Sequence, residues 1–137
     1  MRTLFDVNIL MSAGSSSDGL PEMVLEHAST IPQEIIVSRE MIKRVDSVLQ
    51  RRYFALRMSD QRRLKYVTRL RSTMIYLEPD PSVTGVADDA EDDRVLGTAV
   101  AGRADIFFTG DKGMLAISSF VGIPIVTART FLDRIDY

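Results

Sequence analysis

The sequence predicts an α/β fold, in which a central, mostly parallel sheet of about five strands is flanked by helices in a single domain over residues 1–137. Short apolar segments of strand length alternate with longer segments whose apolar residues recur at helical spacing, as is typical of βαβ units. The 137 residues, 45% of them hydrophobic and 26% charged, suffice for one buried core and not for two. The sequence contains no internal repeat.

Five apolar segments are the predicted strands. They are residues 2–7 (RTLFDV), 34–37 (EIIV), 74–77 (MIYL), 106–109 (IFFT) and 123–126 (IPIV). Uniformly apolar strands are typical of parallel sheets that are buried on both faces, so helices are expected on both sides.

Capping residues and apolar spacing predict the helices. Pro21 suits a first helical position, and Ser38, Asp111 and Thr127 suit N-caps, as does Ser59 or its neighbour Asp60. The predicted helical segments are 21–28, 38–49, 59–70, 91–102, 111–117 and 127–135, with loops at 12–19 and 79–90.

The composition excludes several kinds of functional site. The chain has no cysteine, which excludes disulfide scaffolds, zinc ribbons, thiol nucleophiles and iron–sulfur ligation. His27 is the only histidine, so multi-histidine metal sites are excluded as well. Chemistry in this protein must therefore come mainly from carboxylates. Asp6 interrupts the N-terminal apolar run before it reaches signal-peptide length, so a cytoplasmic location is expected.

The net charge of −2 conceals a basic and an acidic segment. Residues 51–71 carry eight basic residues and one acid, whereas residues 78–93 carry seven acids and no base. Arginines at helical spacing can bind nucleic-acid phosphates, and they can equally form a solvated helix face or dock an acidic partner. The nucleic-acid-binding candidates are Arg51, Arg52, Arg62, Arg63, Lys65 and Arg69.

Three aspartates occupy informative positions. Asp6 follows the first predicted strand, Asp111 follows the fourth, and Asp92 lies in the first turn of a helix. Loops at the carboxyl ends of parallel strands share one edge of the sheet, where ligands bind. Converging carboxylates repel one another, and a hard divalent cation such as Mg²⁺ or Mn²⁺ relieves that repulsion. Such a site can hydrolyse a phosphodiester with a metal-activated water.

Each of these acids also has a purely structural interpretation. Asp111 is a good N-cap, and Asp92 and Asp93 suit the positive end of a helix dipole. Asp6 with Asn8 fits an Asx-type turn. It is their joint placement on one edge that makes the functional interpretation competitive.

Four segments in order resemble the PIN-domain family, in particular the VapC-like ribonuclease toxins of bacterial toxin–antitoxin systems. They are DVN at 6–8, DDRVLGTAVAGRAD at 92–105, TGD at 109–111 and IPIVTARTFLDRI at 123–135. The resemblance implies an endoribonuclease that uses Mg²⁺ or Mn²⁺ held by the catalytic residues Asp6, Asp92 and Asp111. Asn8, Thr109 and Asp93 would support the site. It further implies an RNA substrate, a cognate antitoxin partner and a homodimer.

Two positions depart from the family pattern. Val7 replaces the usual threonine, and Arg44, counted from Ser38, stands where the family carries a glutamate. A cation cannot ligate a metal, so Arg44 would instead offset the charge of the acids. Glu40 lies one turn earlier on the same helix face; it would supply the missing carboxylate or, as we expect, simply pair with Arg44.

These departures leave a second hypothesis open. The chain would then be a non-catalytic PIN module that binds RNA or a partner protein through its basic segment. A phosphoacceptor receiver domain is a third class. Lys112 would be the lysine that such domains carry after a late strand, but the acid pair that they need near the first strand is absent.

Overall fold

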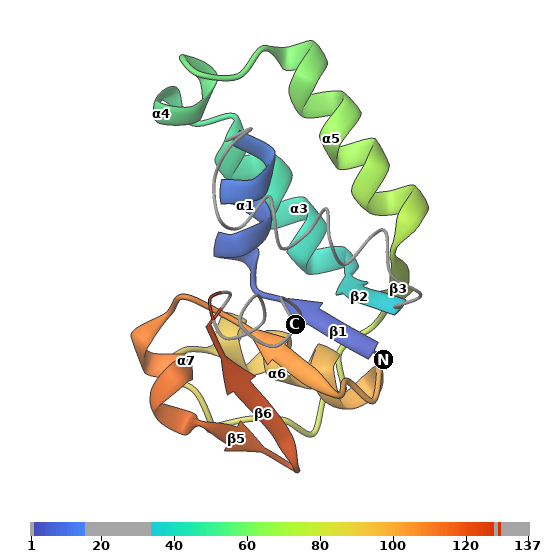
Figure 1. The fold of residues 1–137 in the computed structure, drawn as a ribbon, viewed down its shortest axis with the longest axis vertical. Coiled ribbons are helices and arrows are strands. Elements are labelled where there is room, and N and C mark those ends of the chain that lie inside the picture. The colour runs from blue at the N-terminus through green and yellow to red at the C-terminus, as the bar shows by residue number, and fades with distance from the viewer. Residues whose placement is uncertain (1, 16–33, 128, 130–137) are drawn as a thin grey trace.

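Six strands form one sheet in the computed structural model, in the order β3-β2-β1-β4-β6-β5 (Figure 1). The structure describes residues 2–15, 34–127 and 129. Five strands are parallel: β1 (Arg2–Phe5), β2 (Glu34–Ser38), β3 (Ile75–Leu77), β4 (Ile106–Phe108) and β6 (Ile123–Val126). The short edge strand β5 (Ser119–Phe120) pairs antiparallel with β6.

Two groups of helices accompany the sheet. They are α1 (Val7–Ser15), α3 (Arg39–Leu49), α4 (Arg52–Ala55) and α5 (Asp60–Thr73), followed by α6 (Ala90–Ala101) and α7 (Lys112–Ile117). Figure 1 shows the first group together at one end of the molecule, whereas α6 and α7 lie at the other end with β5 and β6. Both α3 and α6 contact β2, so the two groups meet at the sheet.

All five predicted strands are present, and several elements differ from the prediction along the chain. The first strand ends at Phe5, because the carbonyl of Asp6 already accepts the N–H groups of Ile9 (3.0 Å) and Leu10 (3.1 Å) and so begins α1. Residues 12–15, expected in a loop, continue that helix. Helix α1, the short helix α4 and the edge strand β5 were not predicted. The expected helices at 21–28 and 127–135 fall outside the described residues, apart from Thr127 and residue 129.

Side-chain caps start the helices where the sequence predicts. The hydroxyl of Ser38 accepts the N–H of Met41 (3.2 Å), and that of Ser59, rather than Asp60, accepts the N–H of Arg62 (3.1 Å). The carboxylate of Asp111 caps α7 through the N–H of Gly113 at 2.7 Å. Each cap satisfies a backbone donor that the first helical turn leaves without a partner.

The core lies between the sheet and the helices. The rings of Phe5 and Phe108, on neighbouring strands, stack with centroids 5.4 Å apart. The apolar face predicted for α3 is buried throughout, at Met41, Ile42, Val45, Val48 and Leu49. Among the described residues, no helix is long and apolar enough to cross a bilayer.

The strand order reverses between β1 and β4. From β1 the sheet grows through β2 and β3 on one side, and through β4 and β6 on the other. Such a switch point opens a crevice at the carboxyl ends of the strands, which is where open α/β sheets bind ligands. Asp6 and Thr109, which directly follow β1 and β4, lie at this crevice.

The turn between β5 and β6 stores backbone strain. Val121 and Gly122 join the paired residues Phe120 and Ile123, with φ of +51° and +79°. Two positive φ angles in a two-residue hairpin turn favour Asn-Gly, and Val121 is β-branched and 73% exposed. We therefore expect Val121→Asn to increase the free energy of unfolding by about 1 kcal/mol, measured by urea denaturation.

The control is Val86→Asn, because Val86 is also exposed but has no positive φ. A gain at Val86 equal to that at Val121 would show that loss of exposed apolar surface, and not backbone strain, causes the effect.

Candidate active site

A cleft of about 140 Å³ opens at the switch point, and all three predicted catalytic aspartates line it. Its walls come from the start of α1, the N-terminal half of α3, the start of α6 and the residue that precedes α7. The charged and polar lining residues are Asp6, Asn8, Ser38, Glu40, Arg44, Asp89, Glu91, Asp92, Arg94 and Asp111. The sequence therefore predicted correctly that Asp6, Asp92 and Asp111 share one edge of the sheet.

One hydroxyl joins two of these acidic positions. Thr109 donates its hydroxyl hydrogen to Oδ2 of Asp6 at 2.6 Å, and its Oγ1 accepts the backbone N–H of Asp111 at 3.0 Å. Oδ1 of Asp6 accepts the backbone N–H of Val7 at 2.7 Å. Thr109 is fully buried, so water cannot replace it. The carboxylate of Asp6 is therefore held in one orientation.

Burial makes the negative charge of Asp6 costly. Asp6 is 5% exposed, and removal from water raises the pKa of its carboxyl. The hydrogen bonds from Thr109 and Val7 lower that pKa, nearby Asp111 raises it, and Arg44 lowers it. The pKa remains raised, so a positive charge placed in the cleft would stabilise this carboxylate.

Asp92 is the most strongly perturbed acid of the cleft. Burial, followed by the charges of Asp89, Asp6 and Asp111, raises its pKa to about 6, and Arg44 acts in the opposite direction. Asp89 is the N-cap of α6 and accepts the backbone N–H of Asp92 at 2.8 Å. Four carboxylates therefore interact electrostatically across the cleft.

The chemistry of this donor set suits a hard divalent cation. The donors are carboxylate oxygens, which Mg²⁺ and Mn²⁺ prefer, and the raised pKa values show negative charge that a cation would relieve. Within the described residues, however, no three acidic or histidine side chains are gathered closely enough to hold a metal ion as they stand. The carboxylate oxygens are thus suitable ligands for such an ion, but the side chains would have to move closer together to coordinate it.

Asp93 has a different role from its neighbour Asp92. Its carboxylate accepts the backbone N–H groups of Gly85 (2.9 Å), Val86 (3.0 Å) and Ala87 (2.7 Å), and it does not line the cleft. These bonds, that from Ala87 first, lower the pKa of Asp93. It therefore anchors the loop before α6 and is placed to support the site only indirectly.

The expected pair between Glu40 and Arg44 is not formed. Glu40 pairs instead with Arg94, and Arg44 with Glu91, so two ion pairs cross from α3 to α6. The cleft lies between these two helices, and pairing across it brings each arginine to an acid of the opposite wall. Glu40 thus has its cationic partner on the opposite wall of the cleft and not on its own helix.

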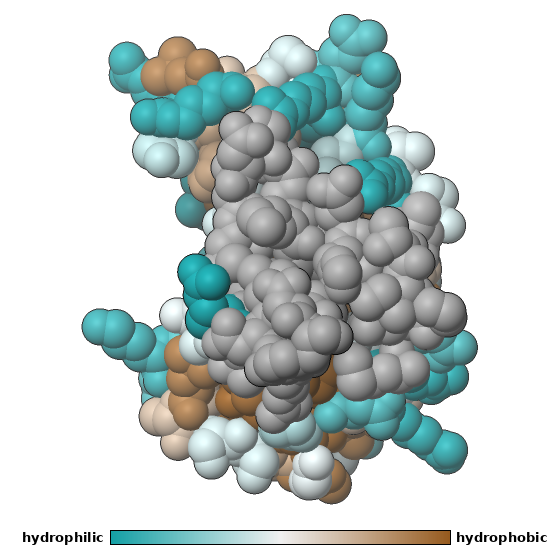
Figure 2. Space-filling model, viewed as in Figure 1, coloured by the Kyte–Doolittle hydropathy of each residue, from teal (hydrophilic) through white to brown (hydrophobic). Residues whose placement is uncertain are grey.

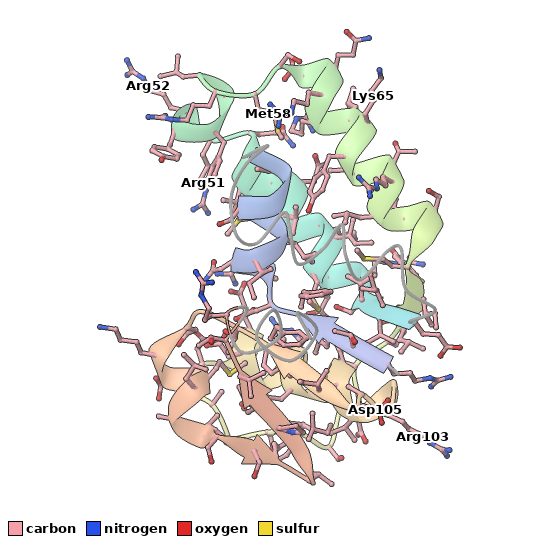
Figure 3. The ribbon with its side chains drawn as sticks, viewed as in Figure 1. Arg51, Arg52, Met58, Lys65, Arg103 and Asp105 are labelled. Carbon is pink, nitrogen blue, oxygen red and sulfur yellow. The ribbon has the colours of Figure 1, made fainter. Side chains whose placement is uncertain are left out.

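The basic segment forms an arm at the far end of the molecule, which we call the α4–α5 arm (residues 51–71). Figure 3 shows Arg51, Arg52 and Lys65 on this arm, and with Arg62 and Arg69 they are exposed. Arg63 differs: its side chain is only 12% exposed and pairs with Asp46 of α3, which fixes α5 to α3. Figure 2 shows apolar residues beside hydrophilic ones at the α4 end.

Three charged residues of the lining, Asp89, Glu91 and Arg94, were not predicted as site residues from the sequence. Asp89 lies in an acidic run at the start of a helix, a position in which capping alone explains an aspartate. Glu91 and Arg94 become recognisable only when α3 and α6 are seen face to face. The acidic run itself was the available signal, but it does not say which acid faces the cleft.

The raised pKa of Asp92 predicts a pH-dependent stability. Because the folded-state pKa of about 6 exceeds the ordinary value of 3.8, the folded protein binds the proton more tightly and becomes more stable as the pH falls from 6 towards 4. At pH 8 we expect Asp92→Asn to unfold at a higher temperature than the wild type in EDTA. Partial exposure limits the gain to about 1–2 kcal/mol.

The difference in melting temperature should shrink through pH 6 and vanish near pH 4. Glu34→Gln removes an acid at the opposite end of the strands, away from the cleft, and serves as the control for net charge. A gain for Asp92→Asn that is constant across this pH range would contradict the electrostatic explanation.

Thr109 provides a second test of the site. Thr109→Val keeps the shape of the side chain but removes the hydroxyl, leaving Oδ2 of Asp6 and the N–H of Asp111 without that partner. We expect a loss of about 1–3 kcal/mol in the free energy of unfolding at pH 7. Thr109→Ser keeps the hydroxyl and should lose less; equal stability of the two variants in urea would contradict the role of this hydrogen bond.

Comparison with known proteins agrees with this architecture. A chain in the crystal structure of VapBC2 from Rickettsia felis, bound to a DNA fragment from its promoter, superposes with a TM-score of 0.64 at 12% identity. The match covers 91% of this chain and 97% of that one, so the two share a fold. No curated protein sequence matches significantly. The PIN-domain family model matches residues 2–113. The chain therefore belongs to the PIN-domain family.

Proposed function

We propose that this protein is an endoribonuclease that depends on Mg²⁺ or Mn²⁺ and acts as the toxin of a toxin–antitoxin pair. The observation that carries the proposal is the cleft at the switch point, in which burial and mutual repulsion raise the pKa values of Asp6 and Asp92. Acids in such an environment are typical of functional sites, because the fold alone gains nothing from repulsion.

The residues proposed to hold the cation are Asp6, Asp92 and Asp111. When bound there, the ion would polarise a phosphodiester and lower the pKa of a water molecule. The protein supplies orientation: Thr109 and the N–H of Val7 fix the two oxygens of Asp6. Asn8 lines the same cleft and is proposed to bind a water or a substrate oxygen.

The α4–α5 arm supports a protein partner. It exposes three large apolar side chains, Tyr53 (61%), Leu56 (73%) and Leu64 (55%), beside its arginines. Exposed leucines do not help to bind phosphates, whereas an acidic segment with apolar residues would cover both features. We propose the antitoxin as that partner, in keeping with the complex seen for VapBC2. A cytoplasmic homodimer is part of the same proposal.

A second candidate function is a non-catalytic PIN module that binds RNA or protein. Two observations favour it: the described acids form no preassembled metal group, and Arg44 occupies the cleft in an ion pair with Glu91. The exposed arginines of the α4–α5 arm would then bind RNA without cleavage.

Cleavage of a labelled single-stranded RNA distinguishes the two functions. The enzyme hypothesis predicts cleavage with Mn²⁺ or Mg²⁺ and none with EDTA. Asp6→Asn and Asp92→Asn should each reduce the rate at least about 100-fold, because each removes a proposed ligand. Glu34→Gln, at the opposite end of the strands, should cleave normally.

Unchanged cleavage in both cleft variants would exclude the proposed site. Absence of cleavage by the wild type, together with salt-sensitive RNA binding, would favour the non-catalytic module instead.

A further inference from the structure

Arg44 is the arginine of the cleft whose charge acts on Asp6 and Asp92. Two arginines line the cleft, Arg44 and Arg94, each paired with an acid of the opposite wall. The charge of Arg44 acts on both Asp6 and Asp92, which line the same cleft. Arg44 is therefore the arginine that interacts electrostatically with the proposed reaction centre.

A phosphodiester that enters this cleft meets excess negative charge. Six carboxylates line it, and the two arginines engage only Glu40 and Glu91. The phosphate is itself an anion, so its approach requires positive charge beyond what a bound cation shares with three aspartates. Arginine suits this role, because its planar guanidinium forms paired hydrogen bonds with two phosphate oxygens.

The present partner of Arg44 can be exchanged at little cost. The side chains of Arg44 and Glu91 are 47% and 55% exposed. Ion pairs with this exposure contribute little to stability, since water solvates both partners once they separate. Glu91 thus positions the guanidinium of Arg44 at the cleft, and the fold depends little on this ion pair.

We propose that Arg44 binds the phosphate of the RNA substrate in this cleft, and that Glu91 competes with the phosphate for the guanidinium. This inference rests on the proposed function only in taking RNA as the ligand, because it concerns binding and not cleavage. Arg44 thereby acts as a substrate-binding residue at a position where the PIN pattern described above has an acid.

A double-mutant cycle tests the competition. The chains carry Asp92→Asn to prevent cleavage, and binding of a short fluorescent single-stranded RNA is followed by anisotropy as a function of salt. We expect Arg44→Ala to weaken binding about 10-fold and to reduce the salt slope by about 0.7, the value for one phosphate contact. Glu91→Gln should tighten binding about 3-fold, and this gain should disappear in the Arg44→Ala chain.

Glu34→Gln is the matched control. Glu34 pairs with Arg2 at the opposite end of the strands, with exposed fractions of 54% and 42%, close to those of Glu91 and Arg44. Both glutamine variants add the same net charge, but only Glu91→Gln frees a cation in the cleft. Glu34→Gln should therefore leave RNA binding unchanged.

Two results would overturn the inference. One is an equal gain from Glu91→Gln and Glu34→Gln, which would reflect net charge alone. The other is a Glu91→Gln gain that persists without Arg44. Either result is compatible with metal-dependent cleavage by the wild type. Conversely, if the wild type does not cleave RNA but the binding cycle gives the expected values, the nuclease proposal is rejected and phosphate binding by Arg44 is retained. Melting temperatures of all variants confirm that they fold.

Discussion

The parallel pairing of β1 with β4 is the constraint on which the cleft depends. The N–H of Asp6 donates to the carbonyl of Phe108 at 2.9 Å, extending the strand ladder one residue beyond β1. This bond places Asp6 beside Thr109, whose own N–H donates to the carbonyl of Val126 at 3.0 Å. Backbone hydrogen bonds between strands distant in the sequence thus place one carboxylate and one hydroxyl side by side, independently of the side-chain interactions of the site.

Around Asp6 and Thr109 the fold brings carboxylates together although they repel one another. Asp6 is buried with hydrogen bonds that only partly offset its loss of water, and Asp92 faces three other carboxylates. A chain selected only for stability would replace such acids, because an apolar or amide group of similar size avoids the penalty. The two ion pairs between α3 and α6 place positive charge at both walls of the cleft and so offset part of this repulsion.

Much of this arrangement could be predicted from the sequence. The strands were recognisable as apolar runs, and Asp6, Asp92 and Asp111 could be placed on one edge because carboxyl ends of parallel strands coincide. The partner of Glu40 could not be predicted, since helical spacing describes neighbours on one helix and not those across a cleft. Nor could the adjacent acids Asp92 and Asp93 be assigned different roles, because the sequence does not show which of them points into the cleft and which points at the loop before α6.

The hydrogen bonds from the loop before α6 to Asp93 affect how this protein responds to acid. Adjacent aspartates on one helix have pKa values displaced in opposite directions: upward for Asp92 in the cleft, downward for Asp93 at the loop. During acidification Asp92 therefore takes up its proton before Asp93 does, and the carboxylate of Asp93 still accepts the three backbone N–H groups of the loop before α6. At mildly acidic pH the loss of charge on Asp92 should weaken the proposed cation site. The loss should be reversible, because the hydrogen bonds of Asp93 keep the loop before α6 in place.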